Sequence, residues 1–381
     1  MKDNIKVTFF SNFLLHHQTP FCEAMVRMIG KNFTFVATEQ IPQERLQMGY
    51  KDLSHSASYA INSYESEENY QKALKLGKNS DVVIIGSAPD VFIEERLKEN
   101  KLTFRYCERF FKKGKWRIFD PRVLLAYYKL HVRNRKKNLH MLCASAYTAP
   151  DCRFISAYPK KTYKWGYFPP VTRYEEFDKI LKQKKKNSIL WVARLIKLKH
   201  PEAPIEIARR LKAEGYTFHL NIIGVGPLQE KLEALIKKYG LGNEVYLLGS
   251  MSPEEVRVYM EQSEIFLFTS DKNEGWGAVL NESMNSGCAV VASDAIGSVP
   301  YLVKNGENGL TYESGKIKDL YQKVKWLLDN PDKRKEMGEK AYQTLVETWN
   351  AETAAERLLA LIEDIQKGED IRFVSGPCSR D

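Results

Sequence analysis

Two glutamates, Glu274 and Glu282, lie eight positions apart in a stretch that could hold a polar ligand. The run 265–270 before them is apolar and typical of a buried parallel strand. After Gly277 the apolar spacing becomes helical. We therefore expect Glu274 at the carboxyl end of a strand and Glu282 about two turns into the next helix. The alternative is an ordinary strand–loop–helix crossover with two solvated acids.

The loop between these acids contains Gly275 and Gly277, which place little steric bulk at the start of the expected helix. A helix N-terminus carries a partial positive charge that favours anions. In open α/β sheets, ligands bind at the carboxyl ends of the strands. The segment therefore predicts close approach of the backbone to a ligand.

A second group of polar residues follows the expected strand 188–193. Arg194 comes directly after this strand, and Lys199 precedes Pro201, which is suited to the first turn of a helix. An arginine and a lysine beside a helix N-terminus make a site suited to a diphosphate. The alternative is a pair of solvated surface cations.

A glycine pair, Gly224 and Gly226, follows the next expected strand and precedes a helix. A complete dinucleotide-binding fingerprint would need a third glycine at the position that Gln229 occupies, so the match to that motif is incomplete. The tight turn still predicts close approach of backbone to a ligand.

The first half of the chain offers fewer candidates. His16 and His17 follow the expected strand 5–11 and could donate to a substrate hydroxyl or phosphate, or be solvated loop residues. Arg105 and Glu108 lie at the end of another expected strand, where they could meet a ligand cleft or form a structural ion pair.

Several other chemistries have no support in the sequence. There is no P-loop, no recognisable Ser–His–Asp arrangement and no Asp-x-Asp pair. The six cysteines form no CxxC pair, and most lie in apolar stretches, as expected of reduced thiols in a cytosolic protein. We therefore expect neither a metal site nor a cofactor, so that cations of the protein would neutralise any leaving diphosphate.

The chain has 381 residues, of which 43% are hydrophobic and 28% charged, which indicates a globular protein with two domains. No run of eighteen apolar residues is present, so no transmembrane helix is expected. The apolar start lacks a small-residue cleavage site and is expected to be a core strand, not a signal peptide. We expect a cytoplasmic protein.

Strand and helix patterns alternate through both halves of the chain, which predicts two doubly wound α/β domains with parallel sheets and a ligand cleft between them. The pair Pro169-Pro170 marks the break. We assign 1–168 to the first domain and 169–350 to the second. Residues 351–381 are expected to pack back on the first domain, with a loose polar tail from Lys367.

The net charge of +10 is concentrated in the stretch 101–137, where thirteen basic residues face two acidic ones. An anionic membrane, a nucleic acid or a phosphorylated substrate could account for this charge, and so could a solvated face that serves solubility. Leucines and tyrosines interleave with the cations over 121–137. The stretch could therefore be an interfacial helix or a core helix with a basic outer face.

Together, the ordered set of Arg194 with Lys199, Gly224 with Gly226, Glu274 with Glu282, and Asn305–Gly309 resembles the donor half of a GT-B glycosyltransferase. The resemblance is to the retaining family 4, also called glycosyl transferases group 1. It covers about 187–348, whereas the first half matches only in general shape. It implies two Rossmann-like domains that face a central cleft, with a C-terminal helix crossing back.

The resemblance also implies roles for single residues. Arg194 and Lys199 would grip the diphosphate of a UDP- or GDP-linked sugar, and Glu282 would bind the ribose. Glu274 would face the transferred sugar, and the backbone of 275–277, including Trp276, would touch sugar or phosphate. In the first domain, His16 or Glu108 would stand for the catalytic histidine of the family. Three positions depart from the family: His200 and Ser298 each replace a glycine, and Tyr301 replaces a glutamate.

The function that the resemblance implies is retaining, metal-independent transfer of a sugar from a nucleotide-sugar to a saccharide or lipid-linked acceptor, in cell-surface polysaccharide or glycolipid biosynthesis. A peripheral place on the inner face of the cell membrane, through 101–137, and no binding of nucleic acid are expected. Two alternatives remain: an epimerase or phosphorylase on the same fold, and a non-catalytic protein that binds through its basic face.

Overall fold

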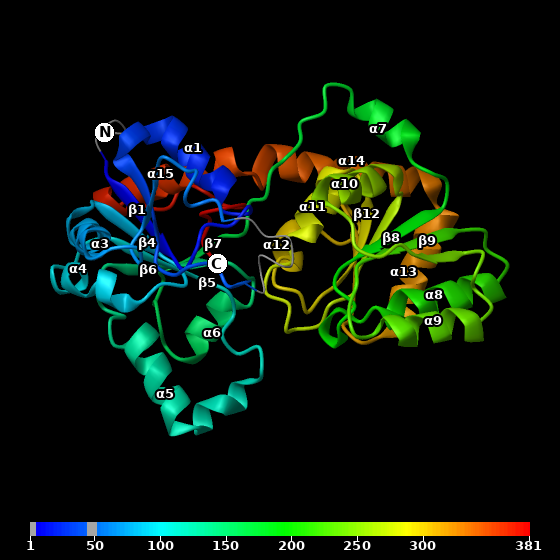
Figure 1. Cartoon of the computed structure of the whole chain (residues 1–381), viewed down its shortest axis with the longest axis horizontal. Coiled ribbons are helices and arrows are strands. Elements are labelled where there is room, and N and C mark those ends of the chain that lie inside the picture. Colours follow the sequence, from blue (N-terminus) through cyan, green and yellow to red (C-terminus); the bar gives the residue numbers. More distant parts are fainter. Residues whose placement is uncertain (1–4, 44–51) are drawn as a thin grey trace. The chain divides into compact units, whose positions relative to one another are not determined.

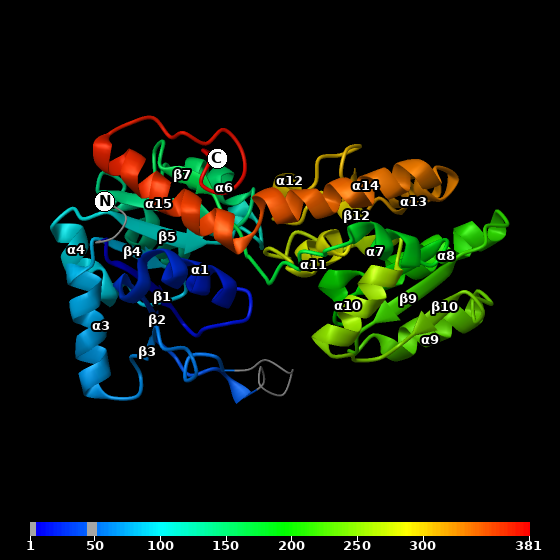
Figure 2. The same cartoon turned by 90° about the horizontal axis from the view of Figure 1, so that it is seen from above.

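The computed structural model describes residues 5–43 and 52–381, and the chain divides into two compact units. The first unit comprises 1–170 and 349–381, and the second comprises 171–348. Figures 1 and 2 show a strand-and-helix arrangement in each. The boundaries predicted from the sequence, 168/169 and 350/351, fall within two residues of these divisions.

The first unit is built on a seven-stranded parallel sheet with the order β3-β2-β1-β4-β5-β6-β7. The central strands β1, β4 and β5 are mostly apolar, as expected where helices cover both faces of a parallel sheet. All five residues of β1 are buried. The strands are β1 Val7–Ser11, β2 Phe33–Ala37, β3 Ala60–Asn62, β4 Val82–Ile85, β5 Thr103–Cys107, β6 Leu139–Cys143 and β7 Thr162–Lys164.

The helices of the first unit include one that returns from the end of the chain. Helix α15 packs against α1, and Arg27 of α1 forms an ion pair with Glu352 of α15 at 2.7 Å. The predicted return of the C-terminal helix to the first domain is thus seen directly (Figure 2). The helical segments are α1 Thr19–Ile29, η2 Gly30–Asn32, α3 Glu67–Asn79, η3 Asp90–Phe92, α4 Glu94–Lys98, η4 Lys115–Phe119, α5 Pro121–Tyr127, η5 Tyr128–Val132, α6 Thr148–Phe154 and α15 Ala351–Lys367.

The C-terminal tail is not the loose end that its polar sequence predicts. The backbone N–H of Lys164 in β7 donates to Ser379 O at 2.8 Å, and the N–H of Cys378 donates to Lys164 O at 2.8 Å. Arg380 forms an antiparallel bridge with Tyr163. Cys378 and Ser379 are fully buried. The prediction was wrong because the tail satisfies the open edge of β7, which composition alone does not reveal.

Other elements of the first unit also differ from the prediction. The stretch 42–63, expected as a loop, contains β3, while its part 44–51 lies outside the described residues. The basic helix, expected over 121–137, ends at Val132 and is followed by turns. Four of the five residues 133–137 are cations, and like charges in one helical turn repel each other.

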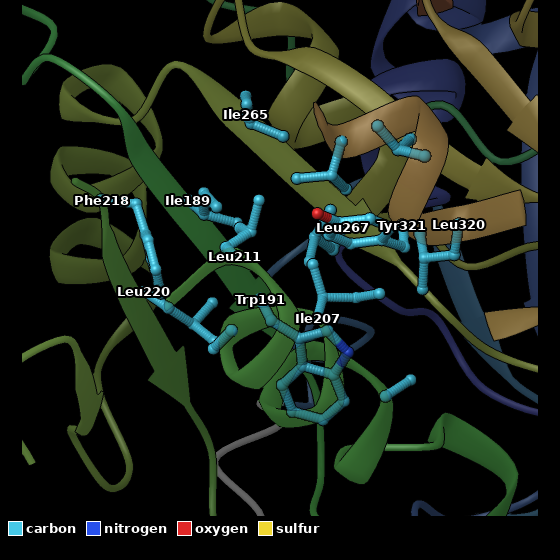
Figure 3. Packing of buried hydrophobic residues seen from close by; sticks show 14 of the residues in the cluster. Ile189, Trp191, Ile207, Leu211, Phe218, Leu220, Ile265, Leu267, Leu320 and Tyr321 are labelled. Atoms are coloured by element: carbon cyan, nitrogen blue, oxygen red, sulfur yellow. The ribbon is translucent and has the colours of Figure 1, made fainter. Parts of the chain in front are cut away.

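The second unit contains a six-stranded parallel sheet with the order β10-β9-β8-β11-β12-β13. Figure 3 shows side chains of β8, β9 and β11 converging with Ile207 and Leu211 of helix α8. Trp191 and Leu267 are almost completely buried in this core. The strands are β8 Ser188–Val192, β9 His219–Ile223, β10 Val245–Leu247, β11 Ile265–Phe268, β12 Ala289–Ser293 and β13 Leu310–Tyr312.

The helices of the second unit follow the predicted alternation, and two of them have the predicted bounds. Helix α10 begins with a reciprocal capping box between Ser252 and Glu255. Helix α13 has an apolar stripe that packs on the core. The helical segments are α7 Phe177–Gln183, η6 Lys197–Lys199, α8 Glu202–Ala213, α9 Gln229–Lys238, α10 Pro253–Gln262, α11 Val279–Asn285, α12 Val299–Leu302, α13 Ile317–Asp329, α14 Pro331–Gln343 and η7 Thr344–Thr348.

Candidate functional site

The second unit has a topological switch point between β8 and β11. From β8 the chain crosses to β9 on one side, and β11 later pairs with β8 on the other side. In doubly wound sheets, ligands bind outside the carboxyl ends of the strands at such a point, because the two adjacent loops diverge there. Arg194 and Lys199 follow β8, and Glu274 follows β11. The sequence candidates thus lie on the two loops that flank the switch point.

Lys199 and Glu274 form an ion pair between Nζ and Oε2. Both side chains are nearly enclosed, with 14% and 13% of their surfaces exposed. The pair holds a cation and a carboxylate at the sheet edge without full solvation, where their electrostatic interactions are stronger than in water. The structure therefore brings together two of the predicted catalytic residues.

The buried core holds the Lys199 turn in place. Trp191 of β8 donates its indole N–H to Thr269 Oγ1 at 2.8 Å. The Thr269 hydroxyl donates in turn to the backbone carbonyl of Lys199 at 2.7 Å. The backbone N–H of Asp271 also donates to Leu198 O at 3.0 Å. This chain of contacts fixes the turn of Lys199 against the loop that carries Glu274.

Arg194 stays at the surface, two residues after the end of β8. Its neighbour Leu195 is buried and donates its N–H to Val225 O at 2.9 Å, which ties the loop after β8 to the loop after β9. The guanidinium is thus carried by a fixed backbone while its side chain remains exposed. Its predicted contact with a diphosphate stays a prediction.

The glycines after β9 have a structural explanation that does not involve a ligand. A Cβ atom at Gly224, whose φ is +137°, would lie 1.9 Å from Ala193 O. A Cβ atom at Gly226 would lie 2.6 Å from Leu195 O. Both positions therefore exclude side chains because the loops after β8 and β9 touch. Whether these glycines also contact a ligand stays a prediction.

The segment after Glu274 combines an enclosed tryptophan with two glycines. Trp276 is 1% exposed and donates its indole N–H to Asn281 Oδ1 at 2.8 Å. At Gly277, with φ of +77°, a Cβ atom would lie 2.3 Å from Phe268 Cζ. The side chain of Trp276 thus anchors the loop in the interior. The predicted ligand contacts of 275–277 concern the backbone and are not tested by this packing.

The position of Tyr301, which departs from the family pattern, is next to this anchor. The Tyr301 ring lies 6.2 Å from the Trp276 ring, and Ser298 Oγ donates to the backbone carbonyl of Trp276. Ser298 is fully buried. The segment 297–301 therefore supports the loop that follows Glu274.

Glu282 lies in the first turn of α11, not two turns into the helix as predicted. The helix begins only at Val279 because the residues before it form the irregular glycine loop. Burial raises the pKa of the half-buried Glu282 carboxyl, and the charge of Arg257 partly offsets this effect. The guanidinium of Arg257 donates to Glu282 O at 3.3 Å and to Ser286 Oγ at 2.9 Å, which fixes the turn.

A half-buried lysine that the sequence reasoning missed holds α10 and α11 together. Lys184 Nζ donates to Ser263 O at 2.7 Å and Ser286 O at 2.9 Å, and to Met260 O and Glu261 O at 3.3 Å each. These carbonyls end the two helices, where backbone acceptors lack partners and a cation is favourable. Lys184 therefore positions the helix that carries Glu282.

His200, which replaces a glycine of the family pattern, adopts a left-handed backbone conformation with φ of +51°. This conformation explains why glycine suits the position. Its imidazole lies 3.4 Å from Glu202 and 3.5 Å from Asp271. The Glu202 carboxylate, followed by Asp271, raises the pKa of His200. The histidine thus accepts strained backbone geometry and lies between two acids.

The motif Asn305–Gly309 folds into a closed turn before β13. Asn308 is buried and donates to Leu302 O and Thr344 Oγ1, both at 2.9 Å. Asn305 Oδ1 accepts from the N–H of Thr311 at 2.9 Å. This part of the predicted motif set has a structural role in the second unit.

In the first unit, His16 is exposed as a residue, although partial burial of its imidazole lowers its pKa. His16 lies edge-on to His17 at 5.4 Å, and His17 stacks on Tyr167 at 4.3 Å. The Tyr167 hydroxyl donates to Glu108 Oε1 at 2.6 Å, and Lys112 pairs with Glu108 Oε2 at 2.6 Å. His16 and Glu108, the two residues predicted to stand for the catalytic histidine, thus belong to one cluster with His17, Tyr167 and Lys112.

Sequence reasoning missed Tyr167 and Lys112 in this cluster. Lys112 could have been found from its i,i+4 spacing to Glu108, but no local signal marks Tyr167, which follows β7. Arg105 does not join the cluster. It is buried and pairs with Asp90 at 2.8 Å, so the structural alternative holds for Arg105.

Two features are absent from the residues that the structure describes. Within 5–43 and 52–381, no group of three or more His, Cys, Asp or Glu side chains is placed to hold a metal ion. In the same residues, no helix has both the length and the apolarity required to span a bilayer.

Solved structures with the same fold include glycosyltransferases. The chain superposes on HepE of Anabaena, solved with UDP, with a TM-score of 0.70, 13% identity, and coverage of 94% of this chain and 100% of the other. For the lipopolysaccharide outer core galactosyltransferase WaaB the TM-score is 0.65 at 17% identity, covering 90% and 95%. The fold is that of the GT-B glycosyltransferases. These similarities concern the fold alone.

The match to a known protein family lies in the second unit. Residues 172–344, nearly the whole of the second unit, match the family model of Glycosyl transferases group 1, as the ordered motifs predicted. The chain is 34% identical over 123 residues to the putative colanic acid biosynthesis glycosyltransferase WcaL of Salmonella typhimurium, covering 31% of this chain and 30% of that protein.

A second relative is the N-acetylgalactosamine-N,N'-diacetylbacillosaminyl-diphospho-undecaprenol 4-alpha-N-acetylgalactosaminyltransferase of Campylobacter jejuni. It is 36% identical over 158 residues, which are 41% of either chain. The matched stretches therefore span between about a third and two fifths of the length of these curated relatives.

Proposed function

We propose that this protein is a retaining glycosyltransferase that moves a sugar from a UDP- or GDP-linked donor to a saccharide or lipid-linked acceptor. The observation that carries the proposal is the enclosed Lys199–Glu274 pair at the switch point of a Glycosyl transferases group 1 domain. A cation and a carboxylate held in this place suit the two ends of a sugar–diphosphate bond. The relatives in polysaccharide and lipid-linked oligosaccharide assembly support the class of acceptor.

The transfer makes opposite demands on charge at the two sides of the bond that breaks. As the bond between the anomeric carbon and the phosphate oxygen lengthens, positive charge develops on the sugar and negative charge on the diphosphate. Lys199 and Arg194 would stabilise the diphosphate, and Glu274 would face the sugar. Preorganised groups of this kind are each worth about 3–4 kcal/mol in the transition state.

Retention follows if the acceptor attacks from the side on which the diphosphate leaves. The acceptor oxygen forms the new bond to the anomeric carbon, and its proton passes to the departing phosphate oxygen. This route needs no covalent intermediate on the protein. It requires the cations to hold the diphosphate beside the reacting carbon. In the present structure Lys199 pairs with Glu274, so donor binding must share or displace this contact.

Binding of the donor is the first test. A thermal-shift screen against UDP-, GDP- and ADP-sugars should raise the melting temperature with one class of donor, because a ligand at one hundred times its Kd stabilises by about 2.7 kcal/mol. Lys199→Ala should remove the shift, whereas Lys197→Ala, an exposed change in the same turn, should not. The absence of a shift with every nucleotide-sugar would contradict the proposal.

Product analysis then separates transfer from other reactions on this fold. Release of free nucleoside diphosphate that depends on an added saccharide or lipid-linked acceptor supports transfer. Turnover of the donor without an acceptor would instead indicate an epimerase. Activity that persists in the presence of EDTA would support neutralisation of the leaving diphosphate by protein cations.

A further inference from the structure

The segment 112–137 of the first unit carries most of the net charge of the chain. It contains ten basic residues and one acidic residue, a formal net charge of +9, whereas the whole chain carries +10. The remaining residues are therefore nearly neutral as a group. Its cations include the exposed Lys113, Lys115, Lys129, Arg135 and Lys136. Charge placed so unevenly indicates a local partner, since solubility requires no such concentration.

The same segment exposes an unusual share of large apolar side chains. The described part of the chain exposes thirteen such side chains, and six of them lie within the fifteen residues 116–130. Phe119 is 84% exposed and Trp116 67%. The other four, with exposed fractions between 37% and 52%, are Leu124, Leu125, Tyr128 and Leu130.

The helix formed by α5 and η5 is apolar on two faces, and only one of them is covered by residues that the structure describes. On the inner face, His131 stacks on Phe110 at 4.6 Å and contacts the Tyr158 hydroxyl at 2.9 Å. Tyr127, four residues before His131, donates to Phe110 O at 3.1 Å. The outer face exposes Leu124, Leu125 and Tyr128, while the exposed Trp116 and Phe119 belong to η4, which precedes the helix. Figure 1 shows α5 extending away from the sheet of the first unit.

We propose that the segment 112–137 is a docking surface for an anionic lipid bilayer. Its exposed aromatic and leucine side chains would enter the boundary between headgroups and acyl chains, and its lysines and arginines would contact lipid phosphates. Tryptophan and tyrosine favour this boundary in particular. The helix would lie in the plane of the membrane, anchored to the protein by the buried His131 and the half-buried Tyr127.

Charge and side-chain chemistry favour a bilayer over other occupants. A second copy of the chain would bring two segments of +9 together, which is repulsive. A nucleic acid would satisfy the cations and could stack on the aromatic rings, but aliphatic side chains such as Leu124 and Leu125 would gain nothing from phosphates. Only a surface that is anionic outside and apolar beneath satisfies both kinds of side chain.

The surface next to the helix is not a pocket for a single phosphate. A depression of 480 Å³ beside Lys129 and Arg133 is also lined by Asp90 and Glu94, and these acids oppose an anion there. The inference therefore concerns association with a charged, extended surface. It does not depend on the proposed sugar transfer, because vesicle binding requires no substrate.

Sedimentation of the full chain with vesicles tests the proposal. The protein should bind vesicles of phosphatidylcholine that contain phosphatidylglycerol, should not bind vesicles of phosphatidylcholine alone, and should dissociate as salt is raised. Equal binding to both kinds of vesicle, or to neither, would overturn the proposal. Salt-sensitive binding to an RNA or DNA oligomer without vesicle binding would assign the segment to nucleic acid and would overturn it as well.

Matched variants locate the binding surface. The variant K129E/R135E/K136E should lower vesicle partitioning by about a hundred-fold or more, because each cation near an anionic surface contributes about five-fold. The control K231E/K237E/K238E makes the same change of net charge on the exposed side of α9 in the second unit and should change partitioning by less than about two-fold. Equal loss in both variants would reduce the effect to overall charge and would overturn the proposal.

The apolar part of the surface is tested separately. L124S/L125S/Y128S removes three exposed side chains of the outer face and should weaken binding at high salt by at least about ten-fold. Because these side chains are exposed, the variant should keep the circular dichroism spectrum and melting temperature of the wild type. Unchanged vesicle binding in this folded variant would contradict insertion of the outer face.

Discussion

Both units place polar side chains just beyond the carboxyl ends of parallel strands, but their cations lie in different environments. In the second unit, Lys199 is enclosed against Glu274, and Lys184 is held by four backbone carbonyls. In the first unit, most cations of the segment 112–137 project into solvent beside exposed apolar groups. A cation held in one place can recognise one small anion, whereas exposed cations on long side chains suit an extended anionic surface.

The histidines differ between the units in the same way. His131 and His140 of the first unit are buried, and burial lowers the pKa of each to about 3. His200 of the second unit is partly exposed, and its pKa is raised, chiefly by Glu202. The first unit thus keeps its buried imidazoles neutral, while the second unit favours the charged form. Acid should therefore act on the two units in opposite directions.

The largest expected effect concerns acid and the first unit. The ordinary histidine pKa is 6.5, so the stabilising contribution of neutral His131 and His140 is present above pH 6.5 and lost as the pH falls toward 3. At pH 5 the loss is about 2 kcal/mol per histidine. For His200 the sign is opposite, since its contribution is present below pH 6.5 and lost as the pH rises through its raised pKa. Urea unfolding at pH 7 and pH 5 measures the difference.

Variants identify the responsible groups in this acid effect. His131→Phe with His140→Leu should make the stability of the chain less dependent on pH between 7 and 5, whereas His219→Leu, an exposed change in the second unit, should leave the dependence as it is. Hydrogen exchange of peptides from β6 and β8 assigns the loss to a unit. If acid increased hydrogen exchange more in β8 than in β6, the predicted difference in acid stability between the two units would be wrong.

The enclosed pair of the second unit provides the next effect in size. Lys199→Ala and Glu274→Ala should each lower kcat by about a hundred- to a thousand-fold, because in the proposed reaction each removes a preorganised group next to the reacting atoms. Lys197→Ala changes an exposed lysine in the same turn and serves as the control. Steady-state kinetics with the identified donor gives the values. Near-normal kcat in both site variants would refute the assignment of Lys199 and Glu274 as catalytic residues.

Lys184 tests whether an enclosed cation also organises the second unit. Lys184→Met leaves the carbonyls that end α10 and α11 without their donor and should lower the free energy of unfolding by about 2–3 kcal/mol. Lys182→Met, an exposed substitution in the last turn of α7, two residues before Lys184, should change it by less than about 0.5 kcal/mol. Urea denaturation compares the two. Similar stabilities would show that solvent can replace Lys184.

The smallest effect concerns donor binding at Glu282. Glu282→Gln should raise the KM for the donor about ten-fold while kcat stays within a factor of about two, because a contact to the ribose is equal in ground and transition states. Glu254→Gln, on the exposed surface of α10, is the control. A fall in kcat with unchanged KM would place Glu282 at the reacting centre and not at the ribose.

Much of the architecture could be predicted from hydrophobic periodicity. Helices α10 and α13 begin and end where the sequence predicts, because a proline or a clear apolar stripe defines each. The short strands β3, β7 and β13 were missed, since each has three residues and exists only through pairing with a longer neighbour. For the same reason the tail that completes β7 was misjudged as loose.

The candidate site could also be predicted only in part from the sequence. The residue types of Arg194, Lys199, Glu274 and Glu282, and their order, sufficed to predict a family that the second unit then matched. The cluster of Glu108 with Tyr167 could not be predicted, because the two residues follow strands that are not neighbours in sequence. The left-handed backbone of His200 was also hidden, since histidine gives no local sign of that conformation.

The amino-acid sequence by itself determined which side chains are available, on which elements they lie, and how unevenly charge is distributed along the chain. Only the tertiary structure decided which of them meet. Lys199 and Glu274 are 75 positions apart and become partners because β8 and β11 are adjacent in the sheet. Leu124 and Leu125 stay exposed because Tyr127 and His131 face inward instead. The spacing of residues along a chain does not predict these contacts, because the pairing of distant strands and the burial of one helix face depend on the whole fold.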